Sequence, residues 1–168
     1  RQCDFADFGN SPFDYTREKV AGKEVVFTTT NGTRAIDAAK NAKHLFVGTF
    51  SNIEALMQKT VEVAERVVIL CAGWNNRASV EDTLFGGHFA ERLSEKTAVS
   101  LESDAVRMAL ELWQSAKDNP LGYLKSSEHY HRLIANGVES DAEYCLKENS
   151  VSVVPVYDKS SGKLIALR

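Results

Sequence analysis

The stretch Arg66-Val67-Val68-Ile69-Leu70-Cys71 decides the expected fold, because its apolar residues run on without a polar interruption. Strands that are apolar on both faces are typical of a parallel sheet covered by helices on both sides. Residues 24–29 and 44–48 are rich in apolar, β-branched and aromatic side chains and are also predicted as strands. Helix-forming sequence separates the three segments. This order predicts an α/β fold with a mostly parallel sheet flanked by helices.

Helix signals fill most of the remaining chain. Ser51 and Glu54 have the spacing of a capping box, which predicts a helix that begins at Ser51. Gly86 and Gly87 lie inside a predicted helix, where glycine is unfavourable, so we expect close packing against a neighbour there. Two final strands around a Ser-Ser-Gly turn predict a β-hairpin, which makes the sheet mixed at its C-terminal end. The predicted helices cover residues 14–20, 33–41, 51–64, 79–94, 103–117, 127–135 and 140–148.

The composition indicates a single globular domain and argues against nucleic-acid binding and against a membrane span. The 168 residues are 43% hydrophobic and 26% charged, which suits one globular domain with a core. A net charge of −3 offers no basic face for nucleic acid, and no apolar run approaches the roughly 18 residues of a membrane span. Three widely spaced cysteines, Cys3, Cys71 and Cys145, indicate free thiols in a reducing cytoplasm. Because the sequence begins at Arg1 rather than Met, we expect residues 1–168 to be the larger, C-terminal part of a longer protein whose N-terminal segment is missing here.

Ligands of open α/β sheets bind beyond the carboxyl ends of the strands, and three such ends carry polar turns here. The turn after the first predicted strand offers hydroxyl groups and backbone N–H groups to an anion. A threonine-rich strand followed by a helix cap explains the same pattern equally well. After the second strand, Ser51 is best explained as a helix cap, and Thr49 or Asn52 is a possible ligand contact. The candidate anion-binding residues of the first turn are Thr29, Thr30, Asn31, Gly32 and Thr33.

A third turn, Cys71-Ala72-Gly73-Trp74-Asn75-Asn76, precedes the acidic pair Glu81-Asp82. Gly73 permits a close backbone approach to a ligand, and two carboxylates could hold Mg²⁺. Acidic residues also favour the first turn of any helix, which is the simpler explanation of the pair. Cys71 and Arg77 have the spacing of a cysteine-dependent phosphatase loop, although the tryptophan and single glycine between them suit a phosphate cradle poorly.

Together these motifs resemble the 2-phosphosulfolactate phosphatase (ComB-like) family, over essentially the whole chain. The strings that carry the resemblance are Gly9-Asn10-Ser11-Pro12, Thr28-Thr29-Thr30-Asn31-Gly32-Thr33, Cys71-Ala72-Gly73, Glu81-Asp82 with Gly86-Gly87, Asp141 to Cys145, and Val153-Val154-Pro155-Val156. Gly87 stands where the family more often has alanine. The family's N-terminal strand, with its Asp and Arg motif, has no counterpart in these 168 residues.

The resemblance implies a Mg²⁺-dependent phosphatase that hydrolyses 2-phosphosulfolactate to sulfolactate and phosphate, a reaction of coenzyme M biosynthesis. Glu81 and Asp82 would bind the metal or act as base, whereas Asn10, Ser11, Gly73 and the threonine-rich turn would bind the ester. Two alternatives remain: a phosphatase with Cys71 as nucleophile, and a non-catalytic anion-binding domain. A homodimer is a further expectation. The main hypothesis requires the threonine-rich turn and the Glu81-Asp82 pair to meet at one rim of the sheet.

Overall fold

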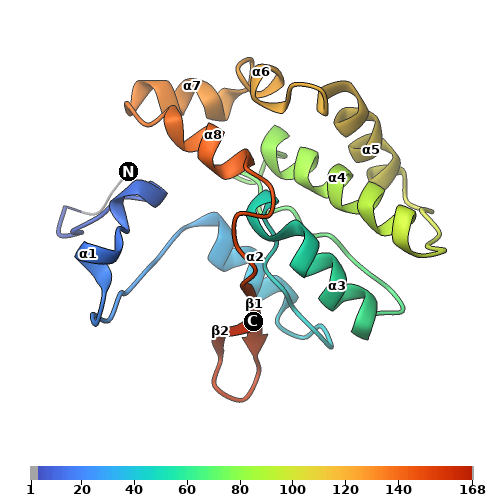
Figure 1. Ribbon diagram of the computed structural model, residues 1–168, viewed down its shortest axis with the longest axis horizontal. Helices are drawn as coiled ribbons and strands as arrows, with labels where there is room; N and C mark the ends of the chain where they lie inside the picture. The colour runs from blue at the N-terminus through green and yellow to red at the C-terminus, as the bar shows by residue number, and fades with distance from the viewer. Residues whose placement is uncertain (1–3, 168) are drawn as a thin grey trace.

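A computed structural model describes residues 4–167, and helices dominate it (Figure 1). Short 3-10 turns at Pro12–Asp14 and Phe50–Asn52 precede two of the helices. The sheet in the described residues consists of β1 (Val154–Asp158) and β2 (Lys163–Leu167). The helices are α1 (Arg17–Val20), α2 (Asn31–Ala39), α3 (Ile53–Val63), α4 (Val80–Lys96), α5 (Asp104–Ala116), α6 (Pro120–Leu124), α7 (Glu128–Ala135) and α8 (Ser140–Leu146).

Helix α4 is the centre of the core because it has apolar partners on two sides. One cluster joins α4 to α3 and β1 and consists of Ile53, Leu56, Met57, Phe89, Leu93 and Val154. The other joins α4 to α5 and α6 and consists of Phe50, Leu84, Trp113, Ala116 and Leu124. Figure 1 shows α4 between α3 and α5. Burial of these side chains supplies the main stabilisation, since removal of apolar surface from water is the dominant favourable term in folding.

The predicted close packing at the double glycine of α4 is confirmed. A Cβ atom at Gly87 would overlap the backbone carbonyl of Ala109 on α5 and come within 2.9 Å of the Trp113 Cβ atom. A Cβ atom at Gly86 would meet only the side chains of Ile69, at 3.6 Å, and Cys71, at 3.9 Å. Gly87 therefore lets α4 and α5 approach closely, whereas Gly86 faces the segment 66–71.

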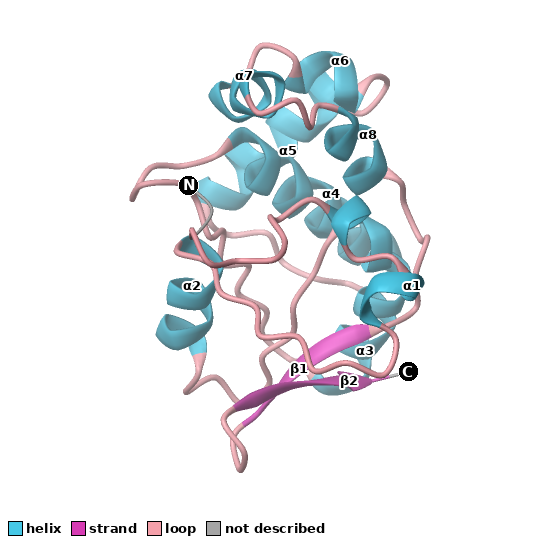
Figure 2. Ribbon diagram, turned by 90° about the vertical axis from the view of Figure 1, so that its left-hand side faces the viewer, coloured by secondary structure: helices cyan, strands magenta, loops and turns pink. Residues whose placement is uncertain are grey.

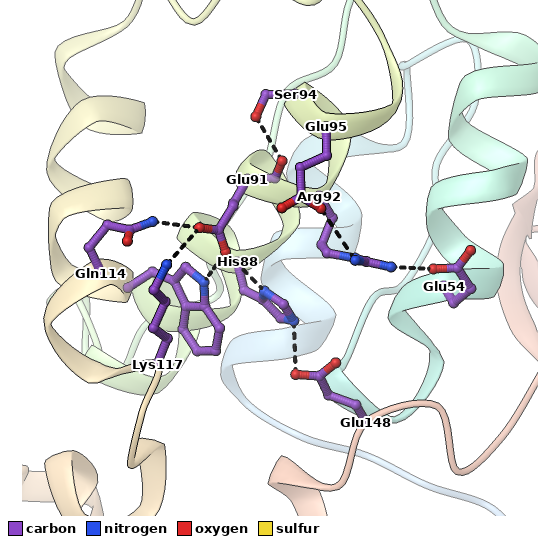
Figure 3. A network of polar contacts seen from close by, with 10 residues as sticks. Glu54, His88, Glu91, Arg92, Ser94, Glu95, Gln114, Lys117 and Glu148 are labelled. Atoms are coloured by element: carbon purple, nitrogen blue, oxygen red, sulfur yellow. Dashed lines mark hydrogen bonds and ion pairs between the residues drawn. The ribbon is translucent and has the colours of Figure 1, made fainter.

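A polar network links α4 to α3, to α5 and to the segment after α8 (Figure 3). The Glu91 carboxylate on α4 accepts hydrogen bonds from Trp113 Nε1 at 2.6 Å and Gln114 Nε2 at 2.5 Å, both on α5. The buried His88 ring places Nε2 2.9 Å from Glu148 Oε1, beyond α8. Arg92 of α4 donates to Glu54 of α3 at 2.7 Å. The network thus fixes how α3 and α5 sit along α4.

The C-terminal hairpin is confirmed, and its antiparallel register runs from Val154 opposite Leu167 to Asp158 opposite Lys163. Segment 45–47 joins its free edge: Val47 N donates to Pro155 O, and Tyr157 N donates to Leu45 O, each at 2.9 Å. An isolated antiparallel bridge between Phe46 and Val156 accompanies these bonds. Figure 2 shows the hairpin at the opposite end of the molecule from α6 and α7.

The structure does not show the mostly parallel sheet, which stays a prediction. Among residues 4–167 the named sheet is the antiparallel hairpin, and residues 24–28 and 66–72 run outside any ladder. Helices combined with a small sheet fit the α/β class. A strand is defined by hydrogen bonds to a neighbouring strand, and in the described part of the chain the strand-like segments 24–29 and 66–71 belong to no ladder.

The start of α3 also differs from the prediction. The capping box is formed by Thr49 and Asn52 rather than by Ser51 and Glu54, and α3 begins at Ile53. Asn52 is buried; its side chain accepts from Thr49 N at 2.9 Å and donates to Val153 O at 3.0 Å. Asn52 therefore serves the fold, because its amide joins the 45–49 segment to the start of the hairpin.

Candidate functional site

A tight turn at residues 73–77 is the first component of the candidate site. Trp74 and Arg77 exchange two backbone hydrogen bonds, of 3.0 and 2.9 Å, around Asn75 and Asn76, whose φ angles are 50° and 59°. This is the geometry of a type I′ turn, and asparagine tolerates its left-handed conformation better than most residues. Gly73 has a φ of 64°, and a Cβ atom there would overlap the Arg77 carbonyl oxygen. Only glycine suits this position.

Asp82 holds this turn against the start of α4. Its Oδ2 atom accepts a hydrogen bond from Gly73 N at 2.6 Å. A short bond from a backbone N–H to a carboxylate is charge-assisted and fixes both partners. Two of the predicted site residues, Gly73 and Asp82, are therefore in direct contact.

Cys71 lies beside the same carboxylate, and its pKa is raised. Burial is the larger cause, and the negative charge of Asp82 adds to it. The reactive form of cysteine is the thiolate, so a raised pKa lowers the population of the nucleophile at neutral pH.

Glu81 points to a different neighbour from Asp82, as adjacent residues on a helix do. Its Oε1 atom lies 3.5 Å from His129 Nδ1 on α7. Among residues 4–167 its Oε2 atom is buried and has no hydrogen-bond partner, and the same holds for Ser79 Oγ. Buried polar atoms are rarely left unpaired, and such exceptions mark candidate ligand contacts.

Helix α7 contributes residues that the sequence analysis missed. Arg132 lies with its guanidinium carbon 4.3 Å from the centre of the Trp74 ring, and His129 approaches Glu81. The two are three residues apart and so share one face of the helix. Neither His129 nor Arg132 belongs to a motif described in the sequence analysis. Their spacing was the only signal in the sequence, and it does not say which element they meet.

The N-terminal loop docks on the neighbouring helix α8. Ser11 Oγ donates to the buried carboxylate of Asp141 at 2.9 Å, and the rings of Phe13 and Tyr144 meet edge to face at 5.1 Å. Asn10 is exposed in the same loop. Helices α7 and α8 pack together. The Ser11 loop and the 73–82 region therefore lie against the same pair of helices.

The threonine-rich turn makes mostly local contacts. Thr33 Oγ1 donates to Thr29 O at 2.5 Å, and α2 begins at Asn31. The segment before the turn reaches the N-terminal loop, since the Phe27 and Tyr15 rings are 5.9 Å apart. Among the described residues no hydrogen bond or ion pair joins Thr29, Thr30, Asn31, Gly32 or Thr33 to the acidic pair. The meeting of this turn with Glu81 and Asp82 at one rim stays a prediction.

A metal would have few protein ligands here. Within residues 4–167 no three His, Cys, Asp or Glu side chains are grouped to hold an ion. Mg²⁺ commonly takes only one or two carboxylates and completes its shell with water and substrate phosphate. The unpaired Glu81 Oε2 and the adjacent Asp82 fit that limited donor set.

These features define an α/β protein whose central helix begins with two carboxylates, beside a glycine turn and a helix that carries His129 and Arg132. Comparison of the sequence with known protein families identifies the class more closely. The chain belongs to the 2-phosphosulpholactate phosphatase family, whose model matches residues 1–160. No helix in residues 4–167 has both the length and the apolar character that a membrane crossing requires.

Curated relatives agree with the family. A protein of Clostridium acetobutylicum is 36% identical over 151 residues, which are 90% of this chain and 64% of that protein. A Clostridium botulinum protein is 36% identical over 153 residues (90% and 63%), and one of Thermotoga petrophila is 35% identical over 149 residues (89% and 63%). Each is named a probable 2-phosphosulfolactate phosphatase. The chain thus spans just under two thirds of the length of these relatives.

Proposed function

We propose that the protein hydrolyses a small phosphate monoester, 2-phosphosulfolactate, to sulfolactate and inorganic phosphate, the reaction of coenzyme M biosynthesis. Membership of the family and the names of the relatives support the reaction class and the substrate. The observation that carries the proposal is the Asp82 carboxylate held against Gly73, with Glu81 beside it. This arrangement puts an acid–base group next to a backbone turn that a charged ester can approach.

Cationic groups at this turn offset the charge of the substrate. Arg132 lies over Trp74, and Arg77 closes the turn. Guanidinium groups bind phosphate and sulfonate oxygens through two parallel donors, which fixes orientation as well as charge. Asn10, Ser11, Gly73 and the threonine-rich turn are proposed as further contacts of the ester. The Ser11 loop supports this, because it docks on α8 beside α7.

Glu81 and Asp82 are proposed to hold Mg²⁺, and the unpaired Oε2 atom of Glu81 supports the assignment. When bound, the ion supplies neutralisation of phosphate charge and a more acidic water molecule. His129 is a positioning residue in this proposal, because it approaches Glu81 from α7 and restricts its orientation.

In the proposed reaction a water oxygen attacks phosphorus and the ester P–O bond breaks. Asp82 or Glu81 accepts the proton that the water loses. The departing oxygen of sulfolactate takes up a proton and becomes a hydroxyl group, so that phosphate and sulfolactate are released. The raised pKa of Cys71 favours this route over a phosphocysteine, whose formation needs the thiolate.

Release of phosphate from 2-phosphosulfolactate in the presence of Mg²⁺ tests the proposal. We expect Asp82→Asn to lower kcat at least about 100-fold, the usual scale for loss of a general base. The matched control, Asp118→Asn, changes an exposed carboxylate in the turn after α5 and should keep full activity. Full activity of Asp82→Asn would remove Asp82 from the reaction.

Two further measurements separate the alternatives. Cys71→Ser should retain turnover if water is the nucleophile and lose it if Cys71 is. Chelation should abolish activity and Mg²⁺ should restore it. Thermal stabilisation by 2-phosphosulfolactate without any phosphate release would instead indicate an anion-binding domain.

A reducing compartment is proposed as the setting of the protein. Cys71 and Cys145 are both free thiols, which supports a reducing compartment such as the cytoplasm. A homodimer stays a prediction, and light scattering during size-exclusion chromatography measures it directly.

A further inference from the structure

The guanidinium group of Arg132 on α7 is a partly buried positive charge without a counterion. Among the arginines of residues 4–167, Arg92 and Arg132 are partly buried. Arg92 pairs with Glu54 at 2.7 Å, whereas the guanidinium of Arg132 makes no ion pair or hydrogen bond within the described residues. A charge that leaves water is costly unless it is paired, so an anionic ligand would offset this cost at Arg132. The other arginines without an ion pair are exposed to water: Arg17, Arg34, Arg66, Arg77 and Arg107.

Trp74 positions this charge at the turn of the candidate site. The guanidinium carbon of Arg132 lies 4.3 Å from the centre of the Trp74 ring, which is a cation–π distance. The ring attracts the cation but supplies no acceptor oxygen, so the N–H donors of the guanidinium remain available for a ligand. The ring also restricts where the guanidinium lies, and a restricted group loses less conformational freedom when a ligand binds.

Arg132 lies near the acidic pair but is separate from it. Gly73, the residue before this tryptophan, donates to Asp82 at 2.6 Å. His129, on the same face of α7 as Arg132, lies 3.5 Å from Glu81. In residues 4–167 no ion pair joins Arg132 to either carboxylate. The 73–77 turn and α7 therefore hold the carboxylates and the guanidinium at two distinct positions of one site.

The proposed substrate carries two anionic groups that match these two positions. In 2-phosphosulfolactate the phosphate ester and the sulfonate are attached to adjacent carbon atoms, and only the phosphate reacts. The phosphorus atom must lie where Glu81 or Asp82 can accept a proton from water, which leaves the second position for the sulfonate. Two oxygens of a sulfonate can accept the parallel N–H donors of one guanidinium.

We propose that Arg132 binds the sulfonate group and makes the protein selective for 2-phosphosulfolactate over esters that lack a sulfonate. The assignment rests on the proposed function, because it takes that substrate as given, and it adds which group of the substrate reaches α7. The carboxylate of the lactate skeleton is the competing anion. The ester 2-phospholactate keeps this carboxylate and the phosphate and lacks only the sulfonate, so it separates the two assignments.

The kinetic test compares both esters with the full-length protein in the presence of Mg²⁺. Arg132→Met should lower the ratio of kcat/KM for 2-phosphosulfolactate to kcat/KM for 2-phospholactate at least about tenfold, the scale of a lost hydrogen bond to a charged group. The change should lie in KM, because the sulfonate is bound equally before and during the reaction. Arg132→Lys keeps the charge without the paired donors and should give an intermediate ratio.

The matched control is Arg107→Met, at an exposed arginine of α5, which should leave the ratio unchanged. An equal loss of kcat/KM for both esters in Arg132→Met would assign this arginine to the phosphate, to the carboxylate or to packing alone, and it overturns the proposal.

Binding of the product distinguishes this proposal from the proposed reaction. Sulfolactate and lactate differ by the sulfonate alone, and isothermal titration calorimetry measures their affinities without turnover. We expect sulfolactate to bind at least about tenfold more tightly than lactate, Arg132→Met to abolish the difference and Arg107→Met to retain it. If this result is obtained while neither ester releases phosphate, the proposed reaction fails and the sulfonate assignment stands. Equal affinities for the two acids, or a difference that Arg132→Met leaves intact, overturns the assignment.

Discussion

Replacement of Gly87 by alanine should force α4 and α5 apart. The added Cβ atom would overlap the Ala109 carbonyl, which is backbone and cannot rotate away, and it would crowd Trp113 Cβ at 2.9 Å. Overpacking of a tight core costs about 1–3 kcal/mol, and contact with rigid backbone puts this site near ~3 kcal/mol. Alanine recovers about 1 kcal/mol of helix propensity. The expected net loss in the free energy of unfolding is about 2 kcal/mol.

Gly86→Ala is the matched control, one residue away in the same helix. Its Cβ atom would meet Ile69 and Cys71 at ordinary contact distances of 3.6 and 3.9 Å. The gain in helix propensity then stands alone, and we expect stabilisation of about 0.5–1 kcal/mol. Urea denaturation followed by circular dichroism measures both values. If the two variants shift stability in the same direction, or if Gly87→Ala is the more stable, the close approach of α4 and α5 at Gly87 is wrong.

Two pH-dependent effects follow from the titratable groups. Burial lowers the pKa of His88 below 6.5, although the carboxylate of Glu148 opposes the shift, so the unfolded chain binds this proton more readily. The stabilisation from neutral His88 should be complete above about pH 6.5 and should fall as pH decreases toward the folded-state pKa. Denaturation at pH 7.5 and 5.5 should show this loss of stability. His88→Gln should reduce the loss, whereas the exposed His44→Gln should leave it unchanged. Hydrogen bonds from Ser161 and the serine before it lower the pKa of Asp158 to about 2. The stabilisation from ionised Asp158 should be present above pH 3.8 and lost as pH falls through about 2. NMR titration of the Asp158 carboxyl should give a midpoint near 2, and Ser161→Ala should raise that midpoint. An unchanged midpoint in Ser161→Ala would contradict the hydrogen bonds from the serines.

The helices could be predicted from the sequence because their signals are local. Helix α5 was expected over 103–117 and lies at Asp104–Ala116, and α7 was expected over 127–135 and lies at Glu128–Ala135. The hairpin was equally local, since its two strands and turn are contiguous. The sheet was not predictable in this way, because a strand needs a partner from elsewhere in the chain.

The candidate site was predictable only in part, for the same reason. Gly73 and Asp82 belong to motifs that stand close in sequence, and the structure joins them. Arg132 and His129 arrive through the packing of α7, about 50 residues further along the chain, with no motif to announce them. Contacts between residues far apart in the sequence, such as those of His129 and Arg132, have no local sequence signal.

The bond between Ser11 and Asp141 spans 130 residues, which sets an order of events during synthesis. At roughly 5–20 residues per second, about 7–26 s separate the appearance of the two side chains at the ribosome. The N-terminal loop must wait undocked for that time, while α3, α4 and α5 already have their mutual partners. Helices α7 and α8, which are made later, therefore complete the region that the Ser11 loop joins.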